Sequence, residues 1–206
     1  MLLAIDCGNT NTVFAVYEDL VCRASWRTST NTQRTADEYA VWLQQLMSLE
    51  GLTLQNIDDV AVSTVVPDSL FNLKALAAKY FDVNALVVGA HGVDPGIDIR
   101  IDHPQQAGAD RIADAVGAHD RYAGPLVVID FGTATTFDVI EADGGYAGGI
   151  IAPGINLSLD ALYRSAAQLP RIAVKAPRVS EGDNTPVKVI GRDTISAMHN
   201  GIFWGY

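Results

Sequence analysis

Several kinds of sequence signal are scarce in this chain of 206 residues. It contains two cysteines, Cys7 and Cys22, which are too few for a disulfide-stabilised scaffold. Its four histidines do not have the spacing of metal ligands, and no cluster of cysteine and histidine occurs. The sequence holds neither a P-loop of the form GxxxxGK[ST] nor a GxGxxG motif, which disfavours a P-loop nucleotide site and a dinucleotide-dependent oxidoreductase.

Long apolar runs are also missing. No stretch approaches the length of a membrane-spanning helix. The N-terminus reads MLLAIDCGNT, with no basic region and an apolar run only from Met1 to Ile5, which is not the pattern of a secretory signal peptide. We therefore expect a cytoplasmic protein that does not bind membranes.

Positive charge is the third deficit. The chain has 14 lysines and arginines against 24 aspartates and glutamates, a net charge of −10. This charge repels nucleic acid and anionic membranes, so we expect neither as a partner. Because it repels ATP as well, phosphate binding would depend on local devices such as backbone amides, hydroxyl groups and metal ions.

What the chain does contain is an internal repeat. Residues 2–18 read LLAIDCGNTNTVFAVYE and residues 126–141 read LVVIDFGTATTFDVIE, so each copy has an apolar run, an aspartate, a glycine, small polar residues and a second apolar run. Asp6 corresponds to Asp130, and Gly8 to Gly132. Two ordinary hairpins would explain the threonines by strand propensity. They would not explain a costly carboxylate at the end of an apolar strand in both copies.

Each copy is followed by a third strand and a helix. In the first half the strand is VCRASWRT, and the helix begins at a capping box of Thr35 and Glu38 and stops at Gly51. The apolar face of this helix is expected at Tyr39, Leu43, Leu46 and Met47. The first half continues with strand DVAVSTVV, helix PDSLFNLKALAAKYF and strand ALVVGA.

In the second half the third strand is YAGGIIA and the helix is ended by Pro170. Its apolar face is expected at Leu159, Leu162, Tyr163, Ala166 and Leu169. After a proline-rich loop, from Pro170 to Pro186, one further helical segment, TISAMHNGIFWGY, is present. The order of elements predicts a duplicated α/β fold with a cleft between its halves.

The glycine turns suit phosphate binding. Gly8 allows the backbone to approach a ligand, and successive amides of the turn form a nest for phosphate oxygens. Asn9, Thr10 and Thr12 add neutral donors. A carboxylate such as Asp6 repels phosphate, but it suits Mg²⁺, which can bridge to the phosphates. The turn that begins at Asp130 offers the same groups.

Four motifs in order carry a specific resemblance. They are DxGNTNT near the N-terminus, GADR at 108–111, DFGTATTFDVI at 130–140 and GGIIAPGINLSLDAL at 148–162. Together, over nearly the whole chain, they resemble the type III pantothenate kinases, also known as the Bvg accessory factor family, of the acetate and sugar kinase/Hsc70/actin superfamily. The resemblance implies duplicated actin-like (ribonuclease H-like) domains, which we expect at 1–115 and 116–206.

The resemblance also implies an activity. These enzymes use ATP to phosphorylate pantothenate to 4'-phosphopantothenate, the first step of coenzyme A biosynthesis, and they are homodimers that need Mg²⁺ and a monovalent cation, K⁺ or NH₄⁺. By the same resemblance, ATP is bound by Asp6, Cys7, Gly8, Asn9, Thr10, Asn11, Thr12, Val13 and Thr133. The cation is bound by Asp130. Pantothenate is bound by Gly108, Ala109, Asp110, Arg111 and Thr194, with Asp110 as the proton acceptor.

Asp110 and Arg111 also have simpler interpretations. Asp110 precedes the helical segment IADAVGAH, where a carboxylate stabilises the helix through its dipole. From spacing alone this interpretation and a catalytic one are about even, and the resemblance favours catalysis. A guanidinium at Arg111 matches the carboxylate of pantothenate, although a lone arginine is often only a surface residue. Family members often have a substrate-contacting tyrosine where this chain has Ile101, which affects the shape of the pocket.

Two other function classes stay open. One is a non-catalytic regulatory or binding protein on the same fold, against which the intact Asp6, Asp110 and Asp130 argue. The other is a phosphotransferase for another small molecule, from which GADR distinguishes this chain.

The second half has no counterparts of strands DVAVSTVV and ALVVGA, and apolar residues crowd its end, namely Ile202, Phe203, Trp204 and Tyr206. We therefore expect the second domain to be incomplete in this sequence, as in a truncated product or a chain whose remainder is not included. Such a chain is expected to bind ATP weakly and to associate, because its second sheet would expose an edge and apolar surface.

Overall fold

The computed structural model describes residues 1–175 and 189–206. The described chain divides into two compact units: unit 1 contains Met1–Val128 and Asp138–Gly148, and unit 2 contains Ile129–Phe137 and Gly149–Tyr206. The strands are β1 (Leu2–Cys7), β2 (Asn11–Glu18), β3 (Val21–Ser29), β4 (Asp59–Thr64), β5 (Leu86–Val87), β6 (Leu126–Phe131), β7 (Ala134–Ile140) and β8 (Tyr146–Pro153). The helices are α1 (Ala36–Leu49), α2 (Pro67–Tyr80), α3 (Ala109–Arg121), α4 (Ile155–Ser165) and α5 (Thr194–Gly205), with short 3-10 turns η1 (Leu54–Asn56) and η2 (Pro104–Gln106). The predicted α/β class is confirmed.

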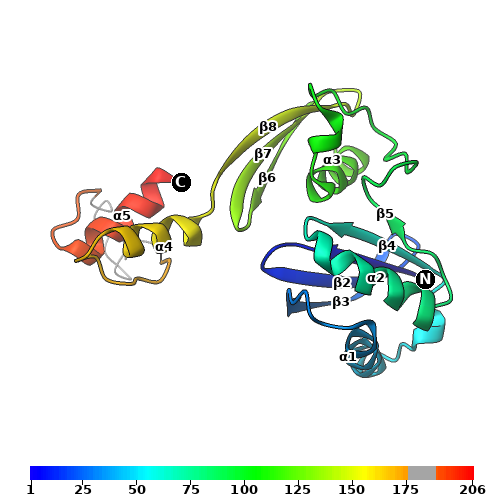
Figure 1. Ribbon diagram of the computed structural model, residues 1–206. Helices are drawn as coiled ribbons and strands as arrows, with labels where there is room; N and C mark the ends of the chain where they lie inside the picture. Colours follow the sequence, from blue (N-terminus) through cyan, green and yellow to red (C-terminus); the bar gives the residue numbers. More distant parts are fainter. Residues whose placement is uncertain (176–188) are drawn as a thin grey trace. The chain divides into compact units, whose positions relative to one another are not determined.

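The first sheet has the strand order β3-β2-β1-β4-β5 and is drawn in blue to green in Figure 1. Strands β1, β2 and β3 pair antiparallel, whereas β4 and β5 are parallel to β1. This is the order of elements predicted for the first half. The last strand is shorter than the predicted segment ALVVGA, because the chain turns at Gly89, where φ is +76°.

One face of this sheet carries the main core. Strand β1 alternates as predicted for a half-buried strand, with Leu3, Ile5 and Cys7 buried in contact with α1 and α2. Helix α1 begins at the predicted capping box, in which Thr35 accepts from the amide of Glu38 and the Glu38 carboxylate accepts from the amide of Thr35. Its predicted face is inside, since Tyr39, Leu43 and Met47 are buried. This core holds the strand that leads into the first glycine turn.

A smaller core lies around α3. Ala115, Ile140 and Tyr146 are buried together, and the partly buried Ile99 and Ile101 pack against them. The segment that contains these isoleucines runs beside Tyr146, whose amide donates to the carbonyl of Asp98 and whose carbonyl accepts from the amide of Arg100, both at 2.8 Å. Both the amide and the carbonyl of Tyr146 are therefore hydrogen-bonded to this segment. Ile101 is partly buried and packs against this smaller core.

The second sheet has the order β6-β7-β8. In unit 2, α4 begins after Gly154 and ends at Ser165, so the predicted helix that reached Leu169 is wrong at its end. The chain leaves the helix because Ala166 takes extended angles. The predicted apolar face is only partly buried: Leu159 is inside, but Leu162 and Tyr163 are exposed by 41% and 42%. Periodicity alone therefore overestimated both the length and the burial of this helix.

The boundary predicted at residue 115 falls inside α3, and the compact units divide the chain elsewhere. The assignment of two whole actin-like domains therefore stays a prediction. Residues 176–186, most of the predicted proline-rich loop, lie outside the described residues. Among the helices of the described residues, none is both long and apolar enough to cross a membrane.

Candidate active site

The first glycine turn connects β1 to β2. Asn9, Thr10 and Asn11 are exposed, and the amide of Gly8 donates to the carbonyl of Asn11 at 3.0 Å, which closes the turn. The hydroxyl of Thr30, which follows β3, donates to the carbonyl of Gly8 at 2.6 Å. The turn is thus held by two hydrogen bonds and exposes small polar residues, which suits a phosphate-binding loop.

Two residues of this motif face the interior. Cys7 and Thr12 are both fully buried. The hydroxyl of Thr12 contacts the sulfur of Cys7 at 3.4 Å and the hydroxyl of Thr30 at 3.0 Å. Their side chains therefore support the turn, and any contact that these two residues make with ATP would come from their backbone.

The second motif, GADR, begins α3 in the same unit. The amide of Val65, just after β4, donates to the carbonyl of Cys7 at 3.2 Å. A Cβ atom placed on Gly108, the N-cap of α3, would lie 3.8 Å from the side chain of Val65. Val65 thus bridges the glycine turn and the start of α3. The structure brings the predicted ATP motif and the predicted pantothenate motif to one end of the first sheet.

Asp110 lies in the first turn of α3, as predicted. Its Oδ1 accepts from the amide of Arg111 at 2.8 Å, and a Cβ on Gly108 would be only 2.5 Å from this oxygen. Glycine at 108 therefore makes room for the carboxylate. Asp110 is half-buried, so it is held in place and still reaches solvent.

Arg111 does not point freely into solvent. Its side chain is 16% exposed and lies against Asp138 of β7, which is fully buried. The Nε atom donates to Oδ1 of Asp138 at 2.6 Å. Nη2 approaches the same oxygen at 2.5 Å, as an ion pair without the angle of a hydrogen bond. The interpretation of Arg111 as a plain surface arginine is therefore wrong.

Tyr146, the first residue of β8, completes this group. Its buried hydroxyl donates to Oδ1 of Asp138 at 2.8 Å, and its ring centre lies 5.6 Å from the guanidinium carbon of Arg111. Burial and the hydrogen bond to Asp138 both raise the pKa of Tyr146. Burial lowers the pKa of Arg111, but its hydrogen bond and ion pair with Asp138 outweigh burial, and the net shift is upward. Both groups keep their protons at neutral pH.

Neither Asp138 nor Tyr146 was predicted from the sequence. Asp138 left a signal, because a carboxylate within the apolar strand TTFDVI needs a partner if it is buried. Its partner is 27 residues away in the chain, and only the packing of α3 on β7 brings the two together.

Unit 2 holds the second glycine turn. Asp130, Gly132 and Thr133 are exposed, and the amide of Gly132 donates to the carbonyl of Ala134 at 2.9 Å. The amide of Gly154, before α4, donates to the carbonyl of Thr133 at 3.0 Å, and a Cβ atom there would lie 2.4 Å from that oxygen. The start of α4 therefore packs directly on this turn, with no acidic residue in its first turn.

Thr194 is the first residue of α5 and is exposed. It follows the N-cap Asp193, whose carboxylate accepts from the amide of Ser196 at 2.9 Å. Its predicted place at the start of a late helix is confirmed. Contact with a substrate stays a prediction.

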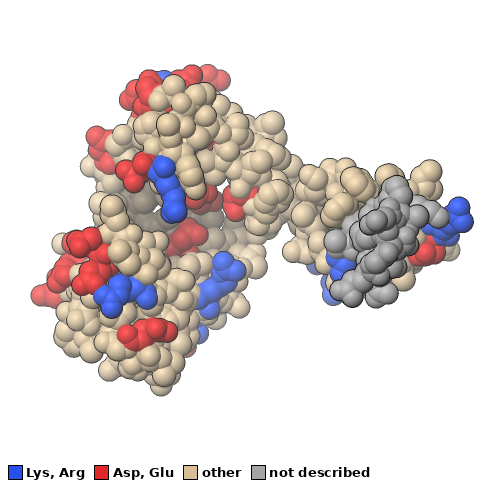
Figure 2. All heavy atoms as spheres, turned by 180° about the vertical axis from the view of Figure 1, so that it is seen from behind, with Lys and Arg blue, Asp and Glu red and all other residues tan. Residues whose placement is uncertain are grey.

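The donor set fits a nucleotide-bound cation. Among residues 1–175 and 189–206, no three His, Cys, Asp or Glu side chains group to hold a metal. Mg²⁺ in phosphotransferases is usually held by one or two carboxylates together with phosphates and water. Asp6 and Asp130, each exposed next to a glycine turn, supply such single carboxylates. On the face shown in Figure 2, acidic and basic groups lie interspersed.

Comparisons with known proteins agree on a family. A family model described as type III pantothenate kinase matches residues 2–206. This chain is similar to the type III pantothenate kinases of Paramagnetospirillum magneticum and Caulobacter vibrioides, with 56% and 54% identity over all of its residues. The matched region covers 76% of each relative.

Solved structures agree on the fold. A Baf family protein from Campylobacter jejuni is similar with a TM-score of 0.54 and 21% identity, over 98% of this chain and 74% of that one. A protein of Sinorhizobium meliloti assigned as a 2-dehydro-3-deoxygalactonokinase has a TM-score of 0.50 and 15% identity, over 81% and 58%. At these identities the likeness concerns the fold alone.

Proposed function

The chain belongs to the type III pantothenate kinase family, and we propose that it transfers the γ-phosphoryl group of ATP to the primary hydroxyl of pantothenate. The product is 4'-phosphopantothenate, in the first step of coenzyme A biosynthesis. The observation that carries this proposal is the placement of Asp110 and Arg111 at the start of α3, joined through Val65 to the glycine turn of β1 and β2.

The ATP phosphates are bound by backbone rather than by lysine. In unit 1 the turn at Gly8 presents amides and the side chains of Asn9, Thr10 and Asn11, and Asp6 and Val13 complete the segment. In unit 2 Thr133 binds ATP beside the start of α4. Such neutral donors suit a protein with a net charge of −10, because they need no excess of positive side chains.

Asp110 takes the proton of the acceptor. As the hydroxyl oxygen of pantothenate bonds to the γ-phosphorus, the bond from that phosphorus to the β–γ bridging oxygen breaks and ADP leaves. The hydroxyl proton passes to the carboxylate of Asp110. Phosphoryl transfer depends mainly on positioning and charge neutralisation, so a carboxylate of ordinary basicity suffices.

Arg111 binds the carboxylate of pantothenate. Its Nε and Nη2 face Asp138, and we assign the substrate carboxylate to Nη1. Gly108 and Ala109 line the same helix start, and Thr194 of unit 2 provides a further contact to pantothenate.

Cations complete the site. Asp6 would hold Mg²⁺ together with the ATP phosphates, and the cation would neutralise part of their charge. Asp130 binds a monovalent cation, K⁺ or NH₄⁺, which offsets the repulsion between this carboxylate and the ATP bound at Thr133. We further propose that the enzyme is cytoplasmic and works as a homodimer, and that its strand triplets β1–β3 and β6–β8 derive from a duplicated actin-like domain.

The test is ADP release from ATP with pantothenate as the acceptor, with the product identified by its mass. We expect turnover with pantothenate and none with acetate or N-acetylglucosamine. Turnover is expected in K⁺ and NH₄⁺ and not in tetramethylammonium. In the Asp130→Asn variant, turnover is expected to be the same in all three cations. ADP release that does not increase with pantothenate would contradict the kinase proposal, and would favour the non-catalytic alternative.

A further inference from the structure

A buried carboxylate stands outside the mechanism given above. Asp138 lies in the middle of β7 and is fully buried, in unit 1 with α3. Moving an ionised carboxylate out of water costs several kcal/mol in proteins, so its partners must be well placed. Replacing such an ion pair by apolar residues is often neutral or stabilising, so stability alone does not account for a buried pair at this position.

Three contacts of Asp138 converge on one oxygen. Oδ1 meets Nε of Arg111 at 2.6 Å, Nη2 of Arg111 at 2.5 Å and the hydroxyl of Tyr146 at 2.8 Å. The ring of Tyr146 also lies beside the guanidinium. Two nitrogens on one edge of the guanidinium, and an aromatic ring beside it, define both the direction and the rotation of the group.

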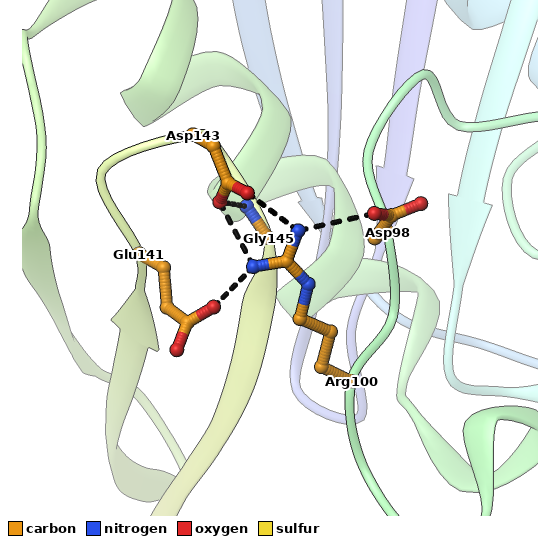
Figure 3. A network of polar contacts seen from close by, with 5 residues as sticks. All are labelled: Asp98, Arg100, Glu141, Asp143 and Gly145. Atoms are coloured by element: carbon orange, nitrogen blue, oxygen red, sulfur yellow. Dashed lines mark hydrogen bonds and ion pairs between the residues drawn. The ribbon is translucent and has the colours of Figure 1, made fainter.

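The other end of this arrangement is equally fixed. Both backbone groups of Tyr146 are hydrogen-bonded to one segment: its amide donates to the carbonyl of Asp98 and its carbonyl accepts from the amide of Arg100. Arg100 in turn is held by carboxylates of the β7–β8 hairpin (Figure 3). With its backbone held and its side chain buried, Tyr146 presents its hydroxyl to Asp138.

We propose that Asp138 and Tyr146 are positioning residues that hold the guanidinium of Arg111 in the orientation that binds the carboxylate of the acceptor. This proposal rests on the kinase function proposed above. Asp138 neutralises Arg111, so Arg111 acts as a directed donor rather than as an unpaired positive charge. Because Asp110 accepts a hydrogen bond from the amide of Arg111, holding Arg111 in place also holds the proposed proton acceptor.

The competing interpretation is that the pair only joins α3 to β7. The two interpretations differ in what a substitution changes. If the pair only joins the two elements, its loss lowers the stability of the fold and changes the KM values for both substrates alike. A positioning pair affects the KM for pantothenate and leaves the KM for ATP almost unchanged.

The experiment measures kcat, both KM values and the thermal midpoint for wild type and Asp138→Asn, which preserves the shape of the side chain. The matched control is Asp37→Asn, since Asp37 also accepts from a cation and a tyrosine, Lys79 at 2.8 Å and Tyr80 at 2.7 Å, but on the surface. We expect Asp138→Asn to raise the KM for pantothenate about 10- to 100-fold, as expected when a binding group is misplaced. Asp37→Asn is expected to change neither KM.

Two further variants make the result decisive. In an Arg111→Ala background Asp138→Asn is expected to cause no additional rise in the KM for pantothenate, because there is no guanidinium left to position. Tyr146→Phe keeps the ring and removes one hydrogen bond, so it is expected to raise the KM for pantothenate less than Asp138→Asn does. This variant also serves if Asp138→Asn does not fold.

The proposal is overturned if Asp138→Asn matches Asp37→Asn, if both KM values rise together, or if the effect persists without Arg111. If Asp138→Asn does not fold, an unchanged KM for pantothenate in Tyr146→Phe overturns it as well. Wild-type turnover with pantothenate is measured first, so that failure of the kinase function can be told apart from failure of the positioning role. If wild type does not phosphorylate pantothenate, the kinase function fails and the positioning role fails with it. If only the variants disagree, the kinase function stands.

Discussion

Two arginines bind carboxylates of the same strand-turn-strand segment, β7 to β8, in opposite surroundings. Arg111 shares one fully buried carboxylate with a tyrosine. Arg100 is surrounded by three exposed carboxylates, Asp98, Glu141 and Asp143 (Figure 3). By number of contacts the Arg100 cluster looks stronger.

Burial reverses that ranking. Exposed ion pairs are screened by water and salt and contribute little, however many partners are counted. A buried pair contributes little as a pair, but removing one partner leaves a charge that water cannot reach. Arg100 therefore stabilises the hairpin weakly, whereas Arg111 and Asp138 depend on each other. The predictions below test this difference, from the largest expected effect to the smallest.

The largest effect is expected at Asp110, which adjoins the buried pair and is the proposed proton acceptor. Asp110→Asn is expected to lower kcat by about 10²- to 10⁴-fold, the usual loss when one positioned proton acceptor is removed. ATP binding and the thermal midpoint should stay near those of wild type. Steady-state kinetics and calorimetric ATP titration test this, with Asp120→Asn, an exposed aspartate of α3, as the control. A kcat near wild type would contradict the role of Asp110.

The second prediction removes one half of the buried pair. Arg111→Met leaves Asp138 without its cation, and we expect it to lower the free energy of unfolding by about 3–5 kcal/mol. The double variant Arg111→Met/Asp138→Leu removes both charges and is expected to recover most of this loss. Urea unfolding followed by circular dichroism measures both. If the single variant is as stable as the double one, the buried charge is hydrated and the contrast with Arg100 fails.

The predictable parts of this molecule are those with local signals. The capping box of Thr35 and Glu38, the strands around both glycine turns and the helix that starts after Gly108 are all where the sequence places them. Each depends on residues within one or two turns of chain. Such local signals also predicted that the candidate catalytic residue, Asp110, lies at the start of a helix.

The parts that failed depend on tertiary packing. Helix α1 buries its predicted face against the first sheet, but Leu162 and Tyr163 of α4 stay exposed, because periodicity does not show what a face meets. The partnership of Arg111 and Asp138 was missed for the same reason, since it joins a helix to a later strand. The sequence predicts which residues do chemistry, and the structure shows which residues contact them.

The third prediction weakens the exposed cluster. Arg100→Gln is expected to lower the thermal midpoint slightly at low ionic strength, because Asp98, Glu141 and Asp143 are left without their shared cation. At about 1 M salt, where screening acts within about 3 Å, the difference from wild type is expected to vanish. Differential scanning calorimetry at both salt concentrations measures it. A loss as large as that of Arg111→Met would show that burial is not what separates the two arginines.

The smallest effect concerns pH. The hydrogen bond from Arg100, followed by the one from the amide of Gly145, lowers the pKa of Asp143 from its ordinary value of 3.8 to about 2. Because the folded pKa lies below the unfolded one, Asp143 contributes stability above pH 3.8, and this contribution is lost as the pH falls towards 2. Asp143→Asn is therefore expected to be slightly less stable than wild type at pH 6, with the gap narrowing by pH 3. Urea midpoints between pH 6 and pH 3 measure the gap, and Asp120→Asn controls for the loss of one negative charge on the surface. A gap that stays constant with pH would mean that Arg100 does not hold Asp143 ionised, and the exposed cluster would then contribute even less than its geometry suggests.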